Sequence, residues 1–530
     1  MSPSFRAIRA ALIILGLGLL LTSCSPLSAA FLRQTPGYAG LFALKNCQGH
    51  PPAVASGSPT RTPPDLIIVQ APVVAPGSLS LRFPQGSRLV RLAASEHPAR
   101  SLTPDFFAVA DPRISFDSAR VLFAGKKTVE LPWQIWEMNV DGSGARQVTQ
   151  CSGDCVKPAY LAHGMMVYTA LSNSPTVLAS SNTKTKSAPS SAHTTIPSAE
   201  SSQLWISNLD GSDAHAITFG PGDFQVETVL KNGTILATAR SPLLPSNGHP
   251  ADRELYTIRL DGTALATLRC DHQHPAIRSE AEELDDGTVV FVKASLTNQN
   301  VGGQLAWIRR GAVHNEPLTA PTIQAMSPQP IDGNELIVAR KSPTGTQAGT
   351  KSSIYSFDAA AGKFGAPLYE DRELAAVEAV PVAAHESPRW YWSTLNADLK
   401  RGYFICLNGY LAQDVPHGRI AAKLARVRVL TLDAKTQQES LLGEASIEED
   451  GSFYIAVPPD KPVRFEVLDA AGRVARAQKS WIWARSGEEH GCVGCHEDRA
   501  VAPENRWPMA LRRFDTPTRL DLANHSAGPN

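Results

Sequence analysis

Residues 135–143 read Ile-Trp-Glu-Met-Asn-Val-Asp-Gly-Ser, an apolar and aromatic stretch that ends in an Asp-Gly turn. The pattern returns at residues 204–212 (Leu-Trp-Ile-Ser-Asn-Leu-Asp-Gly-Ser) and 255–263 (Leu-Tyr-Thr-Ile-Arg-Leu-Asp-Gly-Thr), and weaker copies begin at Leu305 and Ile354. Asp-Gly is a strong signal of a tight hairpin, because both central residues can adopt positive φ. The chain therefore contains a hairpin repeated with a period of roughly 50 residues.

A second strand-and-turn unit lies between successive copies. It reads HGMMVYTA, NGTILATA, DGTVVFVKA and DGNELIVAR, at residues 163–170, 232–239, 286–294 and 332–340. Four short strands in each repeat are typical of a β-propeller blade. With LIIVQAP (66–72) counted as a first unit, the sequence predicts about six blades over residues 65–385. An array of β-sandwiches is the alternative, and three aligned copies disfavour it.

Composition and strand period divide the rest of the 530 residues. Residues 24–64 are predicted to be a Pro/Ser-rich tether, and the Ser/Thr-rich segment 172–202 a disordered insert in the propeller. After Trp390 the repeat stops, and alternating apolar and polar residues predict a small antiparallel β-sandwich over residues 390–486. The last segment, 487–530, is too short to form a core alone. The predicted fold class is therefore all-β.

The first residues have the order of a bacterial export signal. A basic start precedes an apolar run, residues 10–21, which is shorter than the roughly 20 residues of a membrane-spanning helix. Leu-Thr-Ser-Cys, ending at Cys24, resembles a lipobox, so we expect a signal peptide at 1–23 and lipidation of Cys24. An ordinary secretory signal and a short membrane helix are the alternatives. The expected location is the bacterial envelope, and by resemblance to Gram-negative sorting Ser25 favours the outer membrane, facing the periplasm.

Cys492, Cys495 and His496 form a C-x-x-C-H motif. Two thiols three residues apart face the same way on one helical turn, and each can form a thioether with a haem vinyl group. The adjacent histidine can ligate the iron, and attachment in bacteria takes place outside the cytoplasm. The motif therefore predicts one covalent haem c. A zinc site and a structural disulfide remain alternatives, and a redox dithiol would need a βαβ setting that the sequence lacks.

The other cysteines are less informative. Cys151 and Cys155 are close enough to form a local disulfide after export. Three more cysteines make an odd set: Cys47, Cys270 and Cys406. The second axial position of the iron has three candidate ligands, each of which could equally be a surface or packing residue: His490, Met509 and His525.

The order of these parts resembles one known family. The propeller repeat resembles that of the Tol-system B protein. Four stretches resemble the hydrazine synthase alpha-subunit-related family: YFICLNGY (403–410), EEDGSFYIAVP (448–458), RFEVLDAAGR (464–473) and GEEHGCVGCHEDR (487–499). The resemblance implies that Cys492 and Cys495 carry the haem and that His496 is the motif histidine. Full-size members continue into a further haem-bearing domain, and Ala500 stands where a ligand tyrosine is expected.

Two classes of function follow from these observations. The first is an exported, lipid-anchored, c-type cytochrome-like protein that uses one haem for electron transfer with an unidentified redox partner, or for small-molecule redox chemistry. The second is a non-enzymatic envelope propeller that binds partners, with the C-x-x-C-H motif as a disulfide or zinc site. Fifty basic and fifty acidic residues give no sign of a nucleic-acid partner. Whether the chain is an enzyme stays open from sequence.

Overall fold

The computed structural model of the protein describes residues 64–520, except for 73–82, 94–97, 173–200, 241–252, 270–275, 297–301, 313, 342–350, 413–414, 434–437, 479 and 496–504. Within these ranges the regular elements are β-strands, with a few short 3-10 turns, so the predicted all-β class is confirmed. No helix there is long and apolar enough to cross a membrane. Some sequence predictions concern residues outside the described ranges: the signal peptide, Cys24, Cys47, Cys270, His496, Ala500 and His525.

Strands β1 to β24 form six four-stranded blades in the described ranges. Three of the blades, from β8 to β19, are joined into one 12-stranded sheet by single parallel bridges, Ser202 with Asp223 and Arg253 with Ile277. One blade has the order β24 (Ala375–Pro381), β1 (Leu66–Ala71), β2 (Arg88–Leu92), β3 (Arg100–Ser101). The next two are β4 (Ala108–Ile114), β5 (Arg120–Lys126), β6 (Gln134–Asn139), β7 (Arg146–Gln147), and β8 (Cys155–Leu161), β9 (Met165–Ser172), β10 (Ser201–Asn208), β11 (His215–Ala216).

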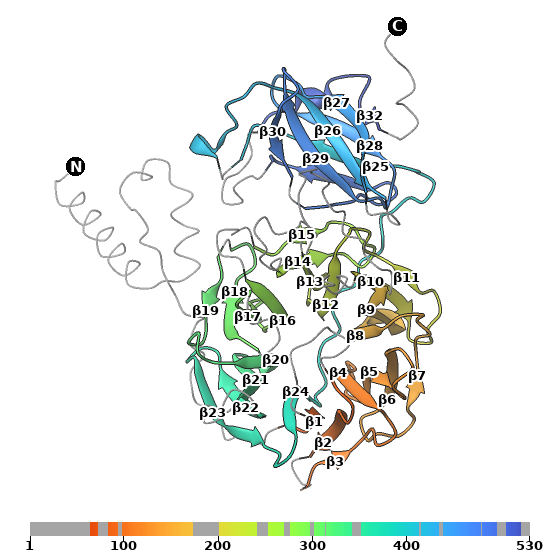
Figure 1. Cartoon of the computed structure of the whole chain (residues 1–530), viewed down its shortest axis with the longest axis vertical. Helices are drawn as coiled ribbons and strands as arrows, with labels where there is room; N and C mark the ends of the chain where they lie inside the picture. The colour runs from red at the N-terminus through yellow and green to blue at the C-terminus, as the bar shows by residue number, and fades with distance from the viewer. Residues whose placement is uncertain are drawn as a thin grey trace, which may run out of the picture. The chain divides into compact units, whose positions relative to one another are not determined.

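The remaining three blades follow in chain order. They are β12 (Asp223–Val229), β13 (Ile235–Arg240), β14 (Arg253–Ile258), β15 (Ala266–Thr267); β16 (Ile277–Glu283), β17 (Val289–Ala294), β18 (Gln304–Ile308), β19 (Glu316–Pro317); and β20 (Ala325–Asp332), β21 (Glu335–Lys341), β22 (Ser352–Asp358), β23 (Lys363–Tyr369). The inner strands β4, β8, β12, β16, β20 and β24 contact one another in sequence and close a ring (Figure 1). The predicted propeller is therefore confirmed.

The sequence repeat corresponds to the third strand of a blade and the turn after it. Of the two central residues only the glycine adopts positive φ, as at Gly142 (φ +85°), whereas we expected it of both. The residue two positions after the glycine also has positive φ in each turn, at Gly144, Asp213 and Ala264. The preceding Asp141 instead accepts a hydrogen bond through Oδ1 from the backbone N–H of Ser143, at 2.9 Å. The same contact recurs at Asp210 and Asp261. The repeated Asp-Gly-Ser/Thr thus encodes an aspartate-capped turn.

A threonine two residues beyond the outermost strand explains another part of the repeat. Thr149 Oγ1 accepts a hydrogen bond from the backbone N–H of Ile135 at 2.9 Å, and Thr218 does the same for Leu204. Equivalent contacts are made by Thr103 and Thr319. These side chains continue the ladder where the outer strand is only two residues long.

Both ends of the propeller segment meet in one blade. β1 pairs antiparallel with β24, from Leu66 opposite Pro381 to Ala71 opposite Ala375, and with β2 on its other side. All six residues of β1 are buried, because the strand lies between two neighbours in its blade. The ring is therefore closed by main-chain hydrogen bonds between strands at opposite ends of the propeller segment.

The ends of the predicted insert need correction. Ser172 belongs to β9, while Ser201 and Ser202 begin β10, and Ser172 pairs with Ser201. Polar residues are accommodated at these positions because they continue a regular antiparallel ladder. The stretch between them, 173–200, lies outside the described ranges.

Two four-stranded sheets form the predicted sandwich. One has the order β31 (Glu489–Cys492), β25 (Gly402–Cys406), β28 (Phe453–Val457), β32 (Thr518–Arg519), and the other β27 (Glu439–Ser446), β26 (Leu424–Leu432), β29 (Val463–Asp469), β30 (Val474–Ala477). Their inner faces share one core that includes Phe404, Val427, Ile455 and Val467. Alternation along each strand places these residues on the same side of their sheets.

The predicted separate tail is instead part of this sandwich. β31 and β32 both come from residues after 486, and they occupy the two edges of one sheet. Each pairs in parallel with its neighbour, β31 with β25 and β32 with β28, so the sandwich is not purely antiparallel. Parallel pairing requires a crossover rather than a hairpin, which local turn signals do not reveal.

Candidate functional site

The C-x-x-C-H motif lies at the end of an edge strand. Cys492 is the last residue of β31, and Cys495 follows in a bend, whereas one helical turn was expected. Both cysteines are partly buried and pack against the sandwich core. His496 comes directly after the described stretch. Because β31 is an edge strand, Cys492 has a sheet neighbour on one side only.

Backbone hydrogen bonds hold the motif to the turn that follows β25. The N–H groups of Leu407 and Asn408 donate to the carbonyls of Cys492 and Val493, at 2.9 and 3.1 Å. In the reverse direction, the N–H of Cys495 donates to the carbonyl of Leu411 at 3.0 Å. The motif backbone is therefore fixed by contacts from both of its cysteines.

Gly494 allows this close approach. A Cβ atom at this position would lie 2.7 Å from Cβ of Leu411 and 2.8 Å from its carbonyl oxygen. Both distances are far below van der Waals contact, and backbone atoms cannot move aside cheaply. Gly491 has room for a side chain, because a Cβ atom there would meet only Ile405 Cγ2, at 4.0 Å.

We expect Gly494→Ala to lower the free energy of unfolding of the sandwich by about 1–3 kcal/mol, because the added methyl forces two turns apart. Gly491→Ala, three residues earlier, is the matched control and should change it by less than about 0.5 kcal/mol. Chemical unfolding followed by circular dichroism measures both values. Equal stability of the two variants would contradict the close contact.

The turn at residues 450–452 supports the turn that follows β25. The N–H of Gly409 donates to the carbonyl of Gly451 at 2.8 Å. Asp450 is 9% exposed, and its Oδ2 accepts a hydrogen bond from the N–H of Met509 at 2.9 Å, while Ser452 Oγ accepts one from Ala510. The segment after the motif, residues 505–511, is thereby tied beside the turn on which the motif rests.

The pKa of Asp450 lies below its usual value of 3.8. Burial acts to raise this pKa, but the hydrogen bonds from Ser452 and from the N–H of Met509 outweigh burial. A lowered pKa in the folded state means that the carboxylate contributes stability above its unfolded pKa and loses that contribution as pH falls through the folded value.

We therefore expect the amide protons of Met509 and Ala510 to lose protection against hydrogen exchange as pH falls below about 4, after correction for the intrinsic exchange rate. Asp450→Asn keeps the shape but removes the titrating charge, so its residual protection should not change over the same range. Identical pH profiles in the two proteins would show that another group holds the tail.

The candidates for a second axial ligand occupy different positions. His490 lies two residues before Cys492 in β31, with its ring centroid 5.4 Å from that of Phe404 and its Nδ1 3.7 Å from Glu488 Oε1. Met509 is partly buried on the tied segment. His525 lies outside the described ranges. The structure thus brings His490 into the same strand as the motif.

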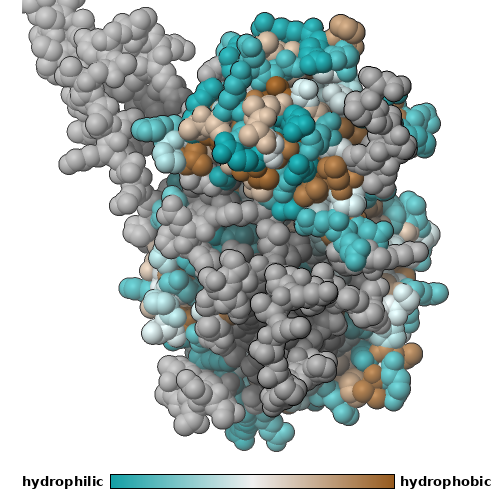
Figure 2. Space-filling model, turned by 45° about the horizontal axis from the view of Figure 1, so that its top comes forward, coloured by the Kyte–Doolittle hydropathy of each residue, from teal (hydrophilic) through white to brown (hydrophobic). Residues whose placement is uncertain are grey.

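The donor set fits a c-type haem. Two partly buried thiols stand at the open edge of a sheet, on a backbone fixed by the neighbouring turn. Figure 2 shows hydrophobic and hydrophilic residues interspersed on the face of the sandwich turned to the viewer. Trp507 and Phe514 of the following segment are exposed.

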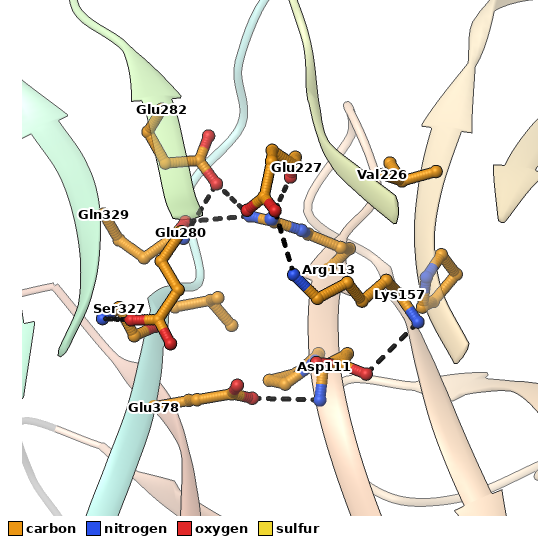
Figure 3. Close-up of a pocket in the computed structure, with 13 residues that line it drawn as sticks. Asp111, Arg113, Lys157, Val226, Glu227, Glu280, Glu282, Ser327, Gln329 and Glu378 are labelled. Carbon is orange, nitrogen blue, oxygen red and sulfur yellow. Dashed lines mark hydrogen bonds and ion pairs between the residues drawn. The ribbon is translucent and has the colours of Figure 1, made fainter. Parts of the chain in front are cut away.

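Sequence analysis missed a charged cluster at the centre of the propeller. Inner strands of several blades line a cavity of about 40 Å³ with Asp111, Arg113, Lys157, Glu227, Glu280, Glu282, Ser327, Gln329 and Glu378 (Figure 3). Lys157 Nζ lies 3.1 Å from Glu227 Oε1, and Arg113 pairs with Glu282. Burial acts to lower the pKa of Arg113, but Glu282 outweighs it and raises this pKa above its usual value.

Carboxylates in this cluster also bind the backbone of the next blade. Glu378 accepts a hydrogen bond from the N–H of Asp111 at 2.9 Å, and Asp111 accepts one from the N–H of Lys157 at 3.1 Å. Glu280 does the same for Ser327 at 2.7 Å. Several of these residues sit in β-bulges with positive φ, which expose the N–H groups. The cluster therefore joins blades. In the sequence, this cluster was indicated only by polar residues inside otherwise apolar strands, some of them next to a proline.

Cys151 and Cys155 form a disulfide beside β8. Among the described residues, no group of His, Cys, Asp and Glu is arranged to hold a metal ion. Cys151 and Cys155 are joined to each other, so neither supplies a ligand to a zinc site at the C-x-x-C-H motif.

Comparisons with known proteins agree with the sandwich and its motif. Residues 412–497 match the family model described as "Hydrazine synthase alpha subunit middle domain". The hydrazine synthase subunit alpha of Kuenenia stuttgartiensis is 23% identical over 548 residues, covering 81% of this chain and 65% of that protein. This chain thus spans 65% of the length of that relative.

One solved structure agrees in fold over most of the chain. Kuenenia stuttgartiensis hydrazine synthase superimposes with a TM-score of 0.72 at 20% identity, covering 85% of this chain and 71% of the other. TolB from Acinetobacter baumannii gives a TM-score of 0.41 at 12% identity, over 62% of this chain and 67% of that one. Over most of its length the chain is therefore similar in sequence to hydrazine synthase subunit alpha and in fold to hydrazine synthase, and its residues 412–497 match the middle domain of that subunit.

Proposed function

We propose that this protein is a c-type haem protein of the bacterial envelope. Cys492 and Cys495 hold one haem through thioether bonds, and His496 ligates the iron. The observation that carries the proposal is the C-x-x-C backbone from Cys492 to Cys495, which hydrogen bonds fix to the neighbouring turn and whose two cysteines are partly buried. When bound, haem supplies one-electron redox chemistry.

The residues of the chain have distinct tasks in this proposal. Gly494 lets the motif backbone lie against Leu411, which sets the spacing of the two thiols. The segment that follows the motif is tied to Asp450 by the N–H of Met509, beside the turn on which the motif rests. The sandwich core behind Cys492 supplies an apolar wall, which favours a stable haem environment. Electron transfer with a redox partner, or redox chemistry on a small molecule, would follow.

Covalent attachment is tested by haem staining of denaturing gels. The protein is produced with a cytochrome c maturation system, alongside a Cys492→Ser/Cys495→Ser variant. We expect stain and a c-type pyridine haemochrome in the parent protein and neither in the variant, because thioether bonds survive denaturation. Cys151→Ser/Cys155→Ser is the matched control and should stay stained. An unstained parent protein would refute the proposal.

The iron's second axial position decides between the two uses of the haem. A shift of the ferrous spectrum with carbon monoxide indicates an open position and favours small-molecule chemistry, whereas an unchanged spectrum favours electron relay. The relative is named a hydrazine synthase, but one haem motif and Ala500 lead us to expect no hydrazine from this chain alone. Hydrazine formed from nitric oxide and ammonium by the purified chain would contradict this.

The envelope location is part of the proposal and rests on the lipobox-like sequence that ends at Cys24. Cys24→Ala should move the protein from the membrane fraction to the soluble fraction when it is expressed with its own signal. Unchanged fractionation would refute the lipid anchor without affecting the haem proposal. The relative's name as a subunit favours binding to partner proteins as well.

A further inference from the structure

We propose that Cys406 and Cys492 form a thiol–disulfide pair, so that Cys492 can be locked in a disulfide before haem is attached. The pair is set by strand register. β25 and β31 run parallel, and their four aligned positions end with Cys406 opposite Cys492. Aligned residues of neighbouring parallel strands point to the same face, about 4.8 Å apart. A disulfide needs Cα atoms roughly 4.4–6.8 Å apart, so the register meets this requirement.

The two cysteines differ in accessibility in the way that exchange requires. Cys406 is 2% exposed and belongs to the sandwich core, whereas Cys492 is partly exposed at the end of the edge strand. An external disulfide can reach Cys492 first, and Cys406 then acts as the resolving thiol. The hydrogen bond from the N–H of Leu407 to the carbonyl of Cys492, 2.9 Å long, keeps the strands together at this point.

Cys495 is the competing partner, and its surroundings differ. It follows the bend at Gly494, its N–H is held by the carbonyl of Leu411, and its Sγ lies 3.8 Å from where a Cβ of Gly409 would stand. Cys492 ends an extended strand aligned with Cys406. Cys406 thus shares a strand register with Cys492, whereas Cys495 belongs to the bend after the strand.

The chemistry is ordinary thiol–disulfide exchange. The Cys492 thiolate attacks an external disulfide, which forms a mixed disulfide and releases one thiol; the Cys406 thiolate then attacks the Cys492 sulfur and releases the second thiol. The external disulfide takes up two electrons, and the two protons lost by the cysteines end on the released thiols. A Cys492 sulfur held in this bond cannot add to a haem vinyl group. This last consequence rests on the proposed function, whereas the disulfide itself does not.

Peptide mapping of the apoprotein tests the pair. The chain is produced without the maturation system, incubated with oxidised glutathione, and digested without reduction for mass spectrometry. We expect a peptide linked through Cys406 and Cys492, absent from Cys406→Ser and retained in Cys495→Ser. The Cys151–Cys155 link serves as an internal control in every sample. A link between Cys492 and Cys495, or an unlinked Cys492, overturns the proposal.

Two further measurements keep the outcome clear. If Cys406→Ser does not fold, Cys406→Ala preserves the apolar environment and replaces it, with folding checked by circular dichroism. Zinc analysis of the untreated apoprotein should show no stoichiometric metal, and one zinc held by Cys406, Cys492 and Cys495 would overturn the pair. With the maturation system and no added reductant, Cys406→Ala should carry more haem per protein than the parent. A linked peptide without any haem stain would refute only the proposed function.

Discussion

Replacing Trp483 by alanine is expected to lower the free energy of unfolding by about 3–5 kcal/mol, the loss typical of a buried tryptophan. Trp483 is 1% exposed and packs into a propeller core cluster, although it follows the sandwich strands in sequence. Its indole N–H donates to the carbonyl of Gly262 at 3.0 Å, and its ring meets Phe219 and Phe224 edge-on at 6.0 and 5.7 Å. Truncation therefore removes both a large apolar contact and a buried hydrogen bond.

The loss should extend to the C-x-x-C-H motif. Arg485 donates to the carbonyl of Asp261 and lies over the ring of Phe219, and Glu488 Oε1 accepts a hydrogen bond from the N–H of Ala264 at 2.9 Å. The third repeat's turn thus binds the segment that leads into β31. Urea unfolding gives the size of the effect. Trp392→Ala, at an 82% exposed position, is the control with little expected change. A loss below about 1 kcal/mol for Trp483→Ala would contradict the anchoring role.

Glu254→Gln should destabilise the propeller by a similar amount, about 3–5 kcal/mol. The side chains of Arg269 and Arg278 are 2% and 0% exposed, and both contact the Glu254 carboxylate. Arg278 Nη1 lies 2.6 Å from Oε1, and Arg269 Nε donates to Oε2 at 3.0 Å. Neutralising the carboxylate removes the negative charge that both buried guanidinium groups contact.

The control is an ion pair of the same kind on the surface. Lys231 Nζ lies 2.7 Å from Asp285 Oδ1, with side chains 52% and 65% exposed. Asp285→Asn should cost less than about 1 kcal/mol, because water screens exposed pairs. Thermal unfolding of both variants separates the two cases. Equal losses would mean that the buried cluster is not held by charge.

Local patterns predicted the fold well where the structure is local. Asp-Gly turns and apolar strands encode the outer three strands of most blades, so their period could be found without coordinates. The antiparallel pairing of β1 with β24 joins strands at opposite ends of the propeller segment. Residues next to either strand in sequence do not predict this pairing. The central cluster was missed for the same reason, because each polar side chain, such as Glu227 or Glu282, satisfies a partner on another blade.

In the candidate site, too, the sequence predicted features that neighbouring residues encode and missed those that depend on distant residues. The C-x-x-C-H spacing identified Cys492 and Cys495, since five consecutive residues are enough to define a haem-attachment motif. The role of Cys406 could not be seen, because its alignment with Cys492 depends on a parallel crossover between β25 and β31. Gly494 was part of the recognised box, but its steric reason lies in Leu411, which belongs to another turn.

The blade made from both ends of the propeller sets an order of events during synthesis. β1 emerges first and must wait for β24, so its polar backbone has no permanent partner on that side until most of the propeller has been made. Contacts so distant in sequence form slowly, and an uncovered strand edge invites pairing with other chains. A newly made copy is therefore most vulnerable to aggregation in the interval before its last blade is finished, and holding chaperones would act during that interval.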